Sequence, residues 1–135
     1  MRTRTAALAL ALFLPLAAGA CGFCIEDRVA AVYDQATVEK AMKEKRHVAF
    51  FGLEGESASL TARTVTAAFE AGGAQRGATR VSLADHACAV VYDPRQTSLE
   101  RVAASAGRAL GTRGVTLTAL RVIDEGGKLK DPAAP

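Results

Sequence analysis

The chain has 135 residues, half of them hydrophobic, with 17 basic and 14 acidic side chains. This length is enough for one small domain. Two of the basic residues, Arg2 and Arg4, stand at the N-terminus, so the rest of the chain carries 15 basic residues against 14 acidic ones and is almost neutral. Without a basic stripe interleaved with aromatic residues, nothing in the sequence indicates nucleic-acid binding.

The first 20 residues, MRTRTAALALALFLPLAAGA, have the features of a secretory signal peptide. A basic start precedes an apolar run that is too short to span a bilayer comfortably, and residues 18–20 form a small-x-small cleavage site. We therefore expect an exported, periplasmic protein whose mature chain begins at Cys21. A lipoprotein signal also ends before a cysteine, which leaves lipid anchoring at Cys21 as the alternative. The large apolar residue usual three positions before that cysteine is replaced here by Ala18.

All three cysteines lie in the expected mature chain. Cys21 and Cys24 form a Cys-x-x-Cys pair, and Cys88 stands alone. Export places them in an oxidising compartment, where an odd number leaves one thiol over if a disulfide forms. The pair comes directly before residues 24–46, whose apolar side chains recur every three or four positions and predict a helix. A shift in phase predicts either a kink near Thr37 or a second short helix capped by it.

The later elements follow in the order strand, helix, strand, strand, helix, strand. They are predicted at residues 47–53, 60–71, 80–83, 87–92, 97–110 and 115–123. Ser57 or Ser59 is the expected cap of the first of these helices, and a capping box from Thr97 to Glu100 starts the second. Residues 125–135 predict a turn and a loose tail.

This order is that of the ferredoxin-like βαββαβ sandwich, an α+β fold in which two helices cover one face of a four-stranded antiparallel sheet. The other face has no cover within the repeat, and an extra N-terminal helix can supply it. We therefore expect a signal peptide at residues 1–20, a Cys-x-x-Cys segment with its helix at 21–46, a ferredoxin-like domain at 47–124 and a flexible tail at 125–135.

The segment ARTVTAAFEAGGAQRGATRVSLADHACAVVYDPRQTSLERVAASAG resembles the heavy-metal-associated domain of copper chaperones and metal-transporting P-type ATPases. Its most specific part is VVYDPRQTSLERV, and RTVTAAFEA is similar to that family's first helix. The resemblance covers residues 48–123 and implies the ferredoxin-like fold. The family holds its metal through a Cys-x-x-Cys in the loop before the first helix. Here that loop reads GLEGESASLTA, with Ala58 and Thr61 at the cysteine positions, so the family's ligands cannot be transferred.

Metal binding is therefore predicted from the N-terminal pair. Thiolates two residues apart can hold one soft ion such as Cu(I), and the start of a helix stabilises thiolates. His86 and Cys88 lie two apart at the start of a strand, so they share a face. If the N-terminal helix crosses that face, Cys21, Cys24, His86 and Cys88 converge into one Cys3His set.

The leading hypothesis is an exported, non-enzymatic protein that binds Cu(I) or a similar soft ion and passes it by ligand exchange to a metal-transporting or metal-accepting partner. It would contact a membrane only if Cys21 is lipidated. The second hypothesis is a thiol-disulfide oxidoreductase, because Cys-x-x-Cys at a helix start is also a redox arrangement. The third is a ligand-less scaffold or lipoprotein that mediates protein contacts through its sheet edge.

Each candidate residue also has a plain structural interpretation. The Cys-x-x-Cys pair can be a structural disulfide, because export favours oxidation. Cys88 can be a small apolar core residue, and His86 can be a solvated turn residue.

Overall fold

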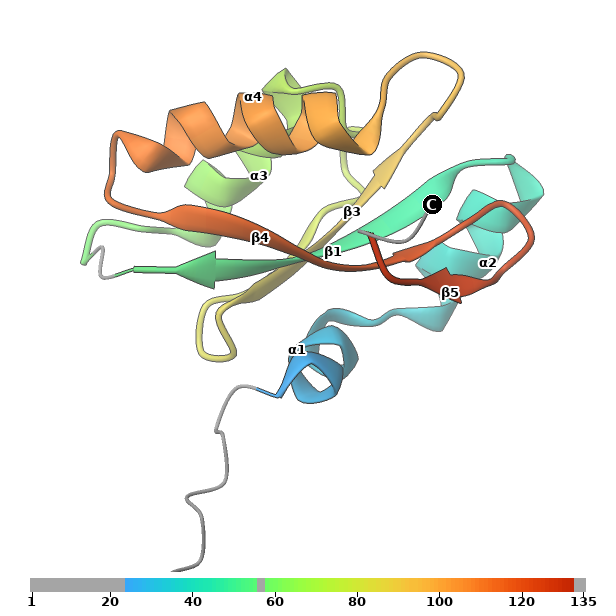
Figure 1. Cartoon of the computed structure of the whole chain (residues 1–135), viewed down its shortest axis with the longest axis horizontal. Coiled ribbons are helices and arrows are strands. Elements are labelled where there is room, and N and C mark those ends of the chain that lie inside the picture. The colour runs from blue at the N-terminus through green and yellow to red at the C-terminus, as the bar shows by residue number, and fades with distance from the viewer. Residues whose placement is uncertain (1–23, 56–57, 133–135) are drawn as a thin grey trace, which may run out of the picture.

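The computed structural model describes residues 24–55 and 58–132 (Figure 1). Four helices pack on one five-stranded antiparallel sheet with the strand order β2-β3-β1-β4-β5, which makes an α+β fold. The helices are α1 (Ile25–Val32), α2 (Gln35–Lys43), α3 (Ala62–Ala71) and α4 (Leu99–Gly111), and the strands are β1 (His47–Glu54), β2 (Arg80–Ser82), β3 (Ala87–Tyr92), β4 (Thr116–Ile123) and β5 (Leu129–Lys130). No helix in the described ranges has the length and apolar character to cross a membrane.

Strand β1 lies in the middle of the sheet, paired with β3 on one side and β4 on the other. Its residues 48–53 are all buried, which a continuous apolar run requires when both faces of a strand are covered. Successive side chains point to opposite faces, so Phe51 and Phe50 belong to different hydrophobic clusters. One cluster lies on each face of the sheet, so the protein has three layers: a pair of helices, the sheet, and a second pair of helices.

Helices α3 and α4 cover one face of the sheet (Figure 1). Their buried residues Val65, Phe69, Val102 and Leu110 pack on alternate residues of β1, β3 and β4. Each helix begins with a hydroxyl cap, from Thr61 in α3 and from Ser98 in α4. Both capping residues are hydroxyl residues, as predicted, but they lie one or more positions further along the chain than the predicted ones. Neighbouring serine and threonine side chains can all cap a helix, so the backbone conformation decides which of them does. Of the predicted α3 caps, Ser57 lies outside the described residues.

Helices α1 and α2 cover the opposite face, which confirms the prediction that the N-terminal segment supplies the missing layer (Figure 1). The predicted break in this segment is also present, but it lies earlier than Thr37. Asp34 ends the connection and caps α2 by accepting a hydrogen bond from the backbone N–H of Thr37 at 2.9 Å. The phase shift in the sequence therefore marks two helices rather than one kinked helix.

The prediction of a loose tail is wrong for the first part of residues 125–135. The chain turns after β4 and returns as β5, so that Leu129 pairs with Ile123 and extends the sheet by one short strand. Asp124 fastens the turn by accepting hydrogen bonds from the backbone N–H groups of Gly126 and Lys128, and its carboxylate lies 2.7 Å from the Lys130 ammonium. These partners lower the pKa of Asp124 to about 2, chiefly through the Lys130 hydrogen bond.

A β-bulge in β4 turns one side chain toward α1. Phe50 pairs with Arg121 but the next residue, Phe51, pairs with Ala119, so Leu120 is the extra residue. Leu120 and Arg121 therefore both lie on the α1 side, where Leu120 joins the hydrophobic cluster and Arg121 donates to Glu26 of α1 at 2.8 Å. The bulge thus supplies one of the attachments of α1 to the sheet.

Candidate functional site

Cys24 occupies the N-cap position of α1 and is exposed. Its backbone carbonyl accepts the first helical hydrogen bond, from Arg28 N–H at 3.1 Å, while its side chain makes no capping bond. The thiol is therefore accessible at the start of a helix that is packed on the sheet. The other half of the pair, Cys21, lies outside the described residues.

Arg28 fixes this helix to the end of the sheet. It follows Cys24 by one turn and is only 6% exposed. Its Nη1 donates to Glu54 Oε1 at 2.7 Å, and its Nη2 donates to the backbone carbonyl of His86 at 2.6 Å. One guanidinium thus joins α1 to the last residue of β1 and to the turn between β2 and β3.

The guanidinium of Arg28 lies directly against Gly52 of β1. A Cβ atom at position 52 would collide with Arg28 Nη2 and stand 2.7 Å from Arg28 Cζ, so only glycine leaves room for this arrangement. Arg28 was not among the site residues predicted from the sequence. A signal for it exists, because Arg28 stands on the face of the helix formed by Ile25, Val29 and Val32, where an apolar residue would be expected.

His86 forms part of the turn that receives Arg28. Its backbone is in the left-handed region with φ of +50°, and its Nδ1 lies 3.3 Å from the Leu53 carbonyl oxygen. The imidazole borders a pocket of about 340 Å³ at the end of the sheet, whose other lining residues are Leu53, Gly55, Ala58, Leu60, Leu83 and Val115. His86 is the one residue of this lining that has a nitrogen or sulfur side-chain ligand for a soft ion.

Cys88 lies on the other face of the sheet from α1. It is fully buried in the cluster under α3 and α4, while its neighbours Ala87 and Ala89 face α1 and α2. Strand alternation explains this placement, and the expected convergence of Cys88 with the N-terminal helix is therefore not found. Within residues 24–55 and 58–132, no three His, Cys, Asp or Glu side chains are grouped so that they could hold a metal ion.

Burial also raises the pKa of the Cys88 thiol, so it stays protonated in neutral solution. We expect a maleimide reagent to modify Cys24 of the reduced, native mature protein and to leave Cys88 unmodified until denaturant is added. The rates for the two residues should differ by at least about a hundredfold, because Cys88 reacts only after the core opens. Mass spectrometry of the labelled protein measures this, with Cys88→Ala as the control. Equal labelling of both thiols in native buffer would contradict the burial of Cys88.

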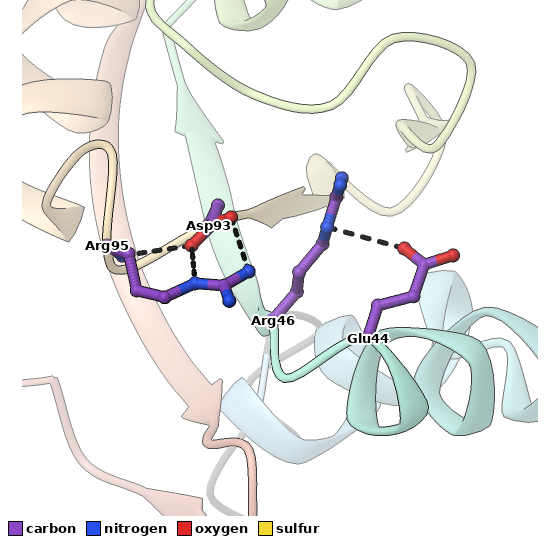
Figure 2. Close-up of polar contacts among 4 residues, drawn as sticks. All are labelled: Glu44, Arg46, Asp93 and Arg95. Atoms are coloured by element: carbon purple, nitrogen blue, oxygen red, sulfur yellow. Dashed lines mark hydrogen bonds and ion pairs between the residues drawn. The ribbon is translucent and has the colours of Figure 1, made fainter.

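A second polar cluster surrounds Asp93 at the end of β3, and Figure 2 shows how its side chains lie. Asp93 accepts hydrogen bonds from the backbone N–H of Arg95 at 2.9 Å and from its guanidinium at 2.9 and 2.8 Å. These bonds, with a smaller contribution from the charge of Arg46, lower the pKa of Asp93 to about 2. Arg46 itself lies 3.3 Å from Glu44.

The Asp93 cluster holds the turn between β3 and α4. The backbone carbonyl of Asp93 accepts from the N–H groups of Gln96 and Thr97, while its side chain holds Arg95. The sequence Tyr92-Asp93-Pro94, which belongs to the most specific part of the resemblance, therefore has a structural role in starting α4. It brings no candidate ligand to Cys24.

Comparisons with protein-family models, with curated proteins and with solved structures gave no match to this chain. The resemblance to the heavy-metal-associated domain stays a prediction from sequence pattern.

Proposed function

We propose that this chain is an exported protein that binds a soft metal ion such as Cu(I) through Cys21 and Cys24. The observation that carries this proposal is the placement of Cys24, which is exposed at the start of a helix that Arg28 fixes to the sheet. The third thiol, Cys88, is enclosed and takes no part.

The fold supports the same proposal. The order β2-β3-β1-β4, with α3 and α4 on one face, agrees with a ferredoxin-like arrangement extended by β5 and by the N-terminal helices. This is the scaffold that the resemblance to the heavy-metal-associated domain implies. The difference lies in the position of the sulfur ligands, which stand before α1 instead of in the loop before α3.

Two thiolates from a Cys-x-x-Cys pair form a low-coordinate site that suits Cu(I). The ion is cargo and keeps its oxidation state. A partner's thiolate forms a new sulfur–metal bond as one bond to this pair breaks, and the open site at the protein surface allows that exchange.

A titration of reduced mature protein, residues 21–135, with Cu(I) in the presence of a chromophoric chelator tests this function. We expect one ion per chain and a loss of affinity of at least about a thousandfold in the Cys21→Ser/Cys24→Ser variant, because both ligands are removed. Cys88→Ala is the matched control and should bind as the unmodified protein does. Binding that survives in the double serine variant, or no competitive binding at all, would overturn the proposal. Intact mass of the exported protein shows whether Cys21 carries a lipid and is therefore unable to act as a ligand.

A thiol-disulfide oxidoreductase is the second candidate, because an exposed thiol at a helix start is also suited to exchange with a substrate disulfide. The reduced pair would attack the substrate, whose two sulfurs leave as thiols while Cys21 and Cys24 form a disulfide. Reduction of insulin by the mature protein with dithiothreitol separates the two functions. Catalysed reduction that is lost in the double serine variant would favour the redox function.

A further inference from the structure

Strand β4 has an outer edge that is only partly used. Its inner edge pairs with β1 from Thr116 to Ile123, whereas β5 pairs with the outer edge only at Val122 and Ile123. Among the described residues no strand pairs with the outer edge from Thr116 to Arg121. Alternate residues of an antiparallel strand direct their N–H and C=O groups to opposite sides, so this stretch offers backbone hydrogen-bonding groups to another extended strand.

The open edge differs in charge from the other edges of the sheet. Strand β2 has three residues, and its Arg80 is exposed and ion-paired with Asp34. Strand β5 has two residues and carries Lys130. Charged side chains on short strands are the usual protection of an edge against pairing. By contrast, residues 115–120 of the chain, VTLTAL, contain no charged side chain, and Arg121 at the far end of the open edge is ion-paired with Glu26 of α1.

Helix α4 packs on β4, and after its first turn it presents small residues beside the open edge. The buried side of α4 contains Val102, Ala106 and Leu110, and Ser105 lies toward α3, beside Gly72. By helical geometry the side away from α3, over the β4 edge, begins with Glu100 in the first turn and continues with Ala103, Gly107 and Gly111.

The two glycines of this α4 side are not required by the packing of the chain itself. A Cβ atom built at Gly107 or Gly111 meets nothing within 4 Å. Glycine inside a helix costs about 1 kcal/mol relative to alanine, so Gly107 lowers the stability of α4 without an internal packing reason. A flat side of α4 beside an open strand would, however, let a second helix approach closely.

We propose that the β4 edge binds a second copy of this chain, with the two β4 strands antiparallel about a two-fold axis at Leu117. This register sets Leu117 opposite Leu117 on the α4 side of the sheet. On the other face it sets each Thr116 opposite Thr118 of the other copy. All these pairs are uncharged, and threonine pairs across a sheet are favourable. The ladder ends before the bulge at Leu120.

The same axis brings the small residues of the two α4 helices together. Val115 N–H donates to the Leu110 carbonyl at 3.2 Å, which aligns the end of α4 with the start of β4. Leu117 lies two residues, about 7 Å, further along the strand, and that distance corresponds to four or five residues back along α4. The axis therefore passes between Ala103 and Gly107. A single two-fold axis thus satisfies the open edge and the small-residue side at once, which is why the occupant is a second copy.

Two charge variants of the mature protein test this register by sedimentation equilibrium. Thr116→Lys/Thr118→Lys places like charges opposite each other twice, so we expect it to weaken association by about tenfold or more. Thr116→Lys/Thr118→Glu places opposite charges at the same points and should associate at least as well as the unmodified protein. Both threonines are exposed, so the fold should tolerate either pair. Ala67→Lys, on exposed α3 surface away from this edge, is the control for added positive charge.

A further variant, Gly107→Leu, tests the contribution of α4. It should melt no lower than the unmodified protein at low concentration, because its side chain enters open space, and it should dimerise less. Unmodified protein that sediments as a monomer up to about millimolar concentration would overturn the proposal. The two charge variants associating equally well would overturn it too, because the register requires them to differ.

Discussion

Replacing Arg28 by alanine is expected to lower the free energy of unfolding by about 3 kcal/mol and to release α1 from the sheet. The substitution removes two charge-assisted hydrogen bonds, to Glu54 and to the carbonyl of His86. Glu54 is half exposed and becomes hydrated, so the main costs are the loss of these bonds and of the packing of the guanidinium against β1. Urea unfolding measures the total, and hydrogen exchange of the α1 amides shows whether the loss is local.

Gly52→Ala provides a matched test of the same contact. In the unmodified chain the added Cβ collides with the guanidinium, so we expect a loss of stability of about 2 kcal/mol. In the Arg28→Ala background that collision is gone, and the cost of Gly52→Ala should nearly vanish. Such non-additivity is the signature of two groups in direct contact. Equal costs in both backgrounds would show that Arg28 does not lie against Gly52.

Replacing Phe51 by alanine is expected to lower the free energy of unfolding by about 4 kcal/mol. Phe51 is fully buried in the centre of the sheet, and its ring centroid lies 4.9 Å from that of Phe69 on α3. A small domain has a total stability of about 5–15 kcal/mol, so this variant should lie close to its unfolding transition at room temperature.

The control for Phe51→Ala is Phe51→Leu, which keeps most of the volume and should cost less than about 1.5 kcal/mol. Chemical denaturation followed by circular dichroism compares the two variants. If Phe51→Ala lowered the free energy of unfolding by less than about 1 kcal/mol, the α3 side of the core would have to be more loosely packed than the structure shows.

The order of the elements from His47 to Ile123 could be predicted because each strand and helix carries its own periodic signal. The apolar run of β1, the capped start of α4 and the alternation in β4 are local properties of the sequence. The presence of helices on both faces of the sheet could also be predicted, because α3 and α4 alone would have left the other apolar face exposed. These features depend on neighbours in the chain, which a sequence displays directly.

The candidate site could be predicted only in part because its geometry depends on distant pairs. Arg28 binds Glu54 and His86, which are 26 and 58 residues away, and no local pattern indicates such partners. Cys88 could be assigned to a strand face, but which helices cover that face follows only from the assembled sheet. β5 was missed because two residues form a strand only where β4 offers an edge and Asp124 fastens the turn.

The central position of β1 has a consequence for how the chain acquires its structure during synthesis. Both strands that pair with β1 come later in the sequence, and β4 begins only at Thr116. A growing chain therefore has α1, α2 and β1 long before it has the neighbours that bury them, so its apolar segments stay unprotected until nearly all residues are made. Assembly of the core is then a late and cooperative event dominated by contacts between remote segments.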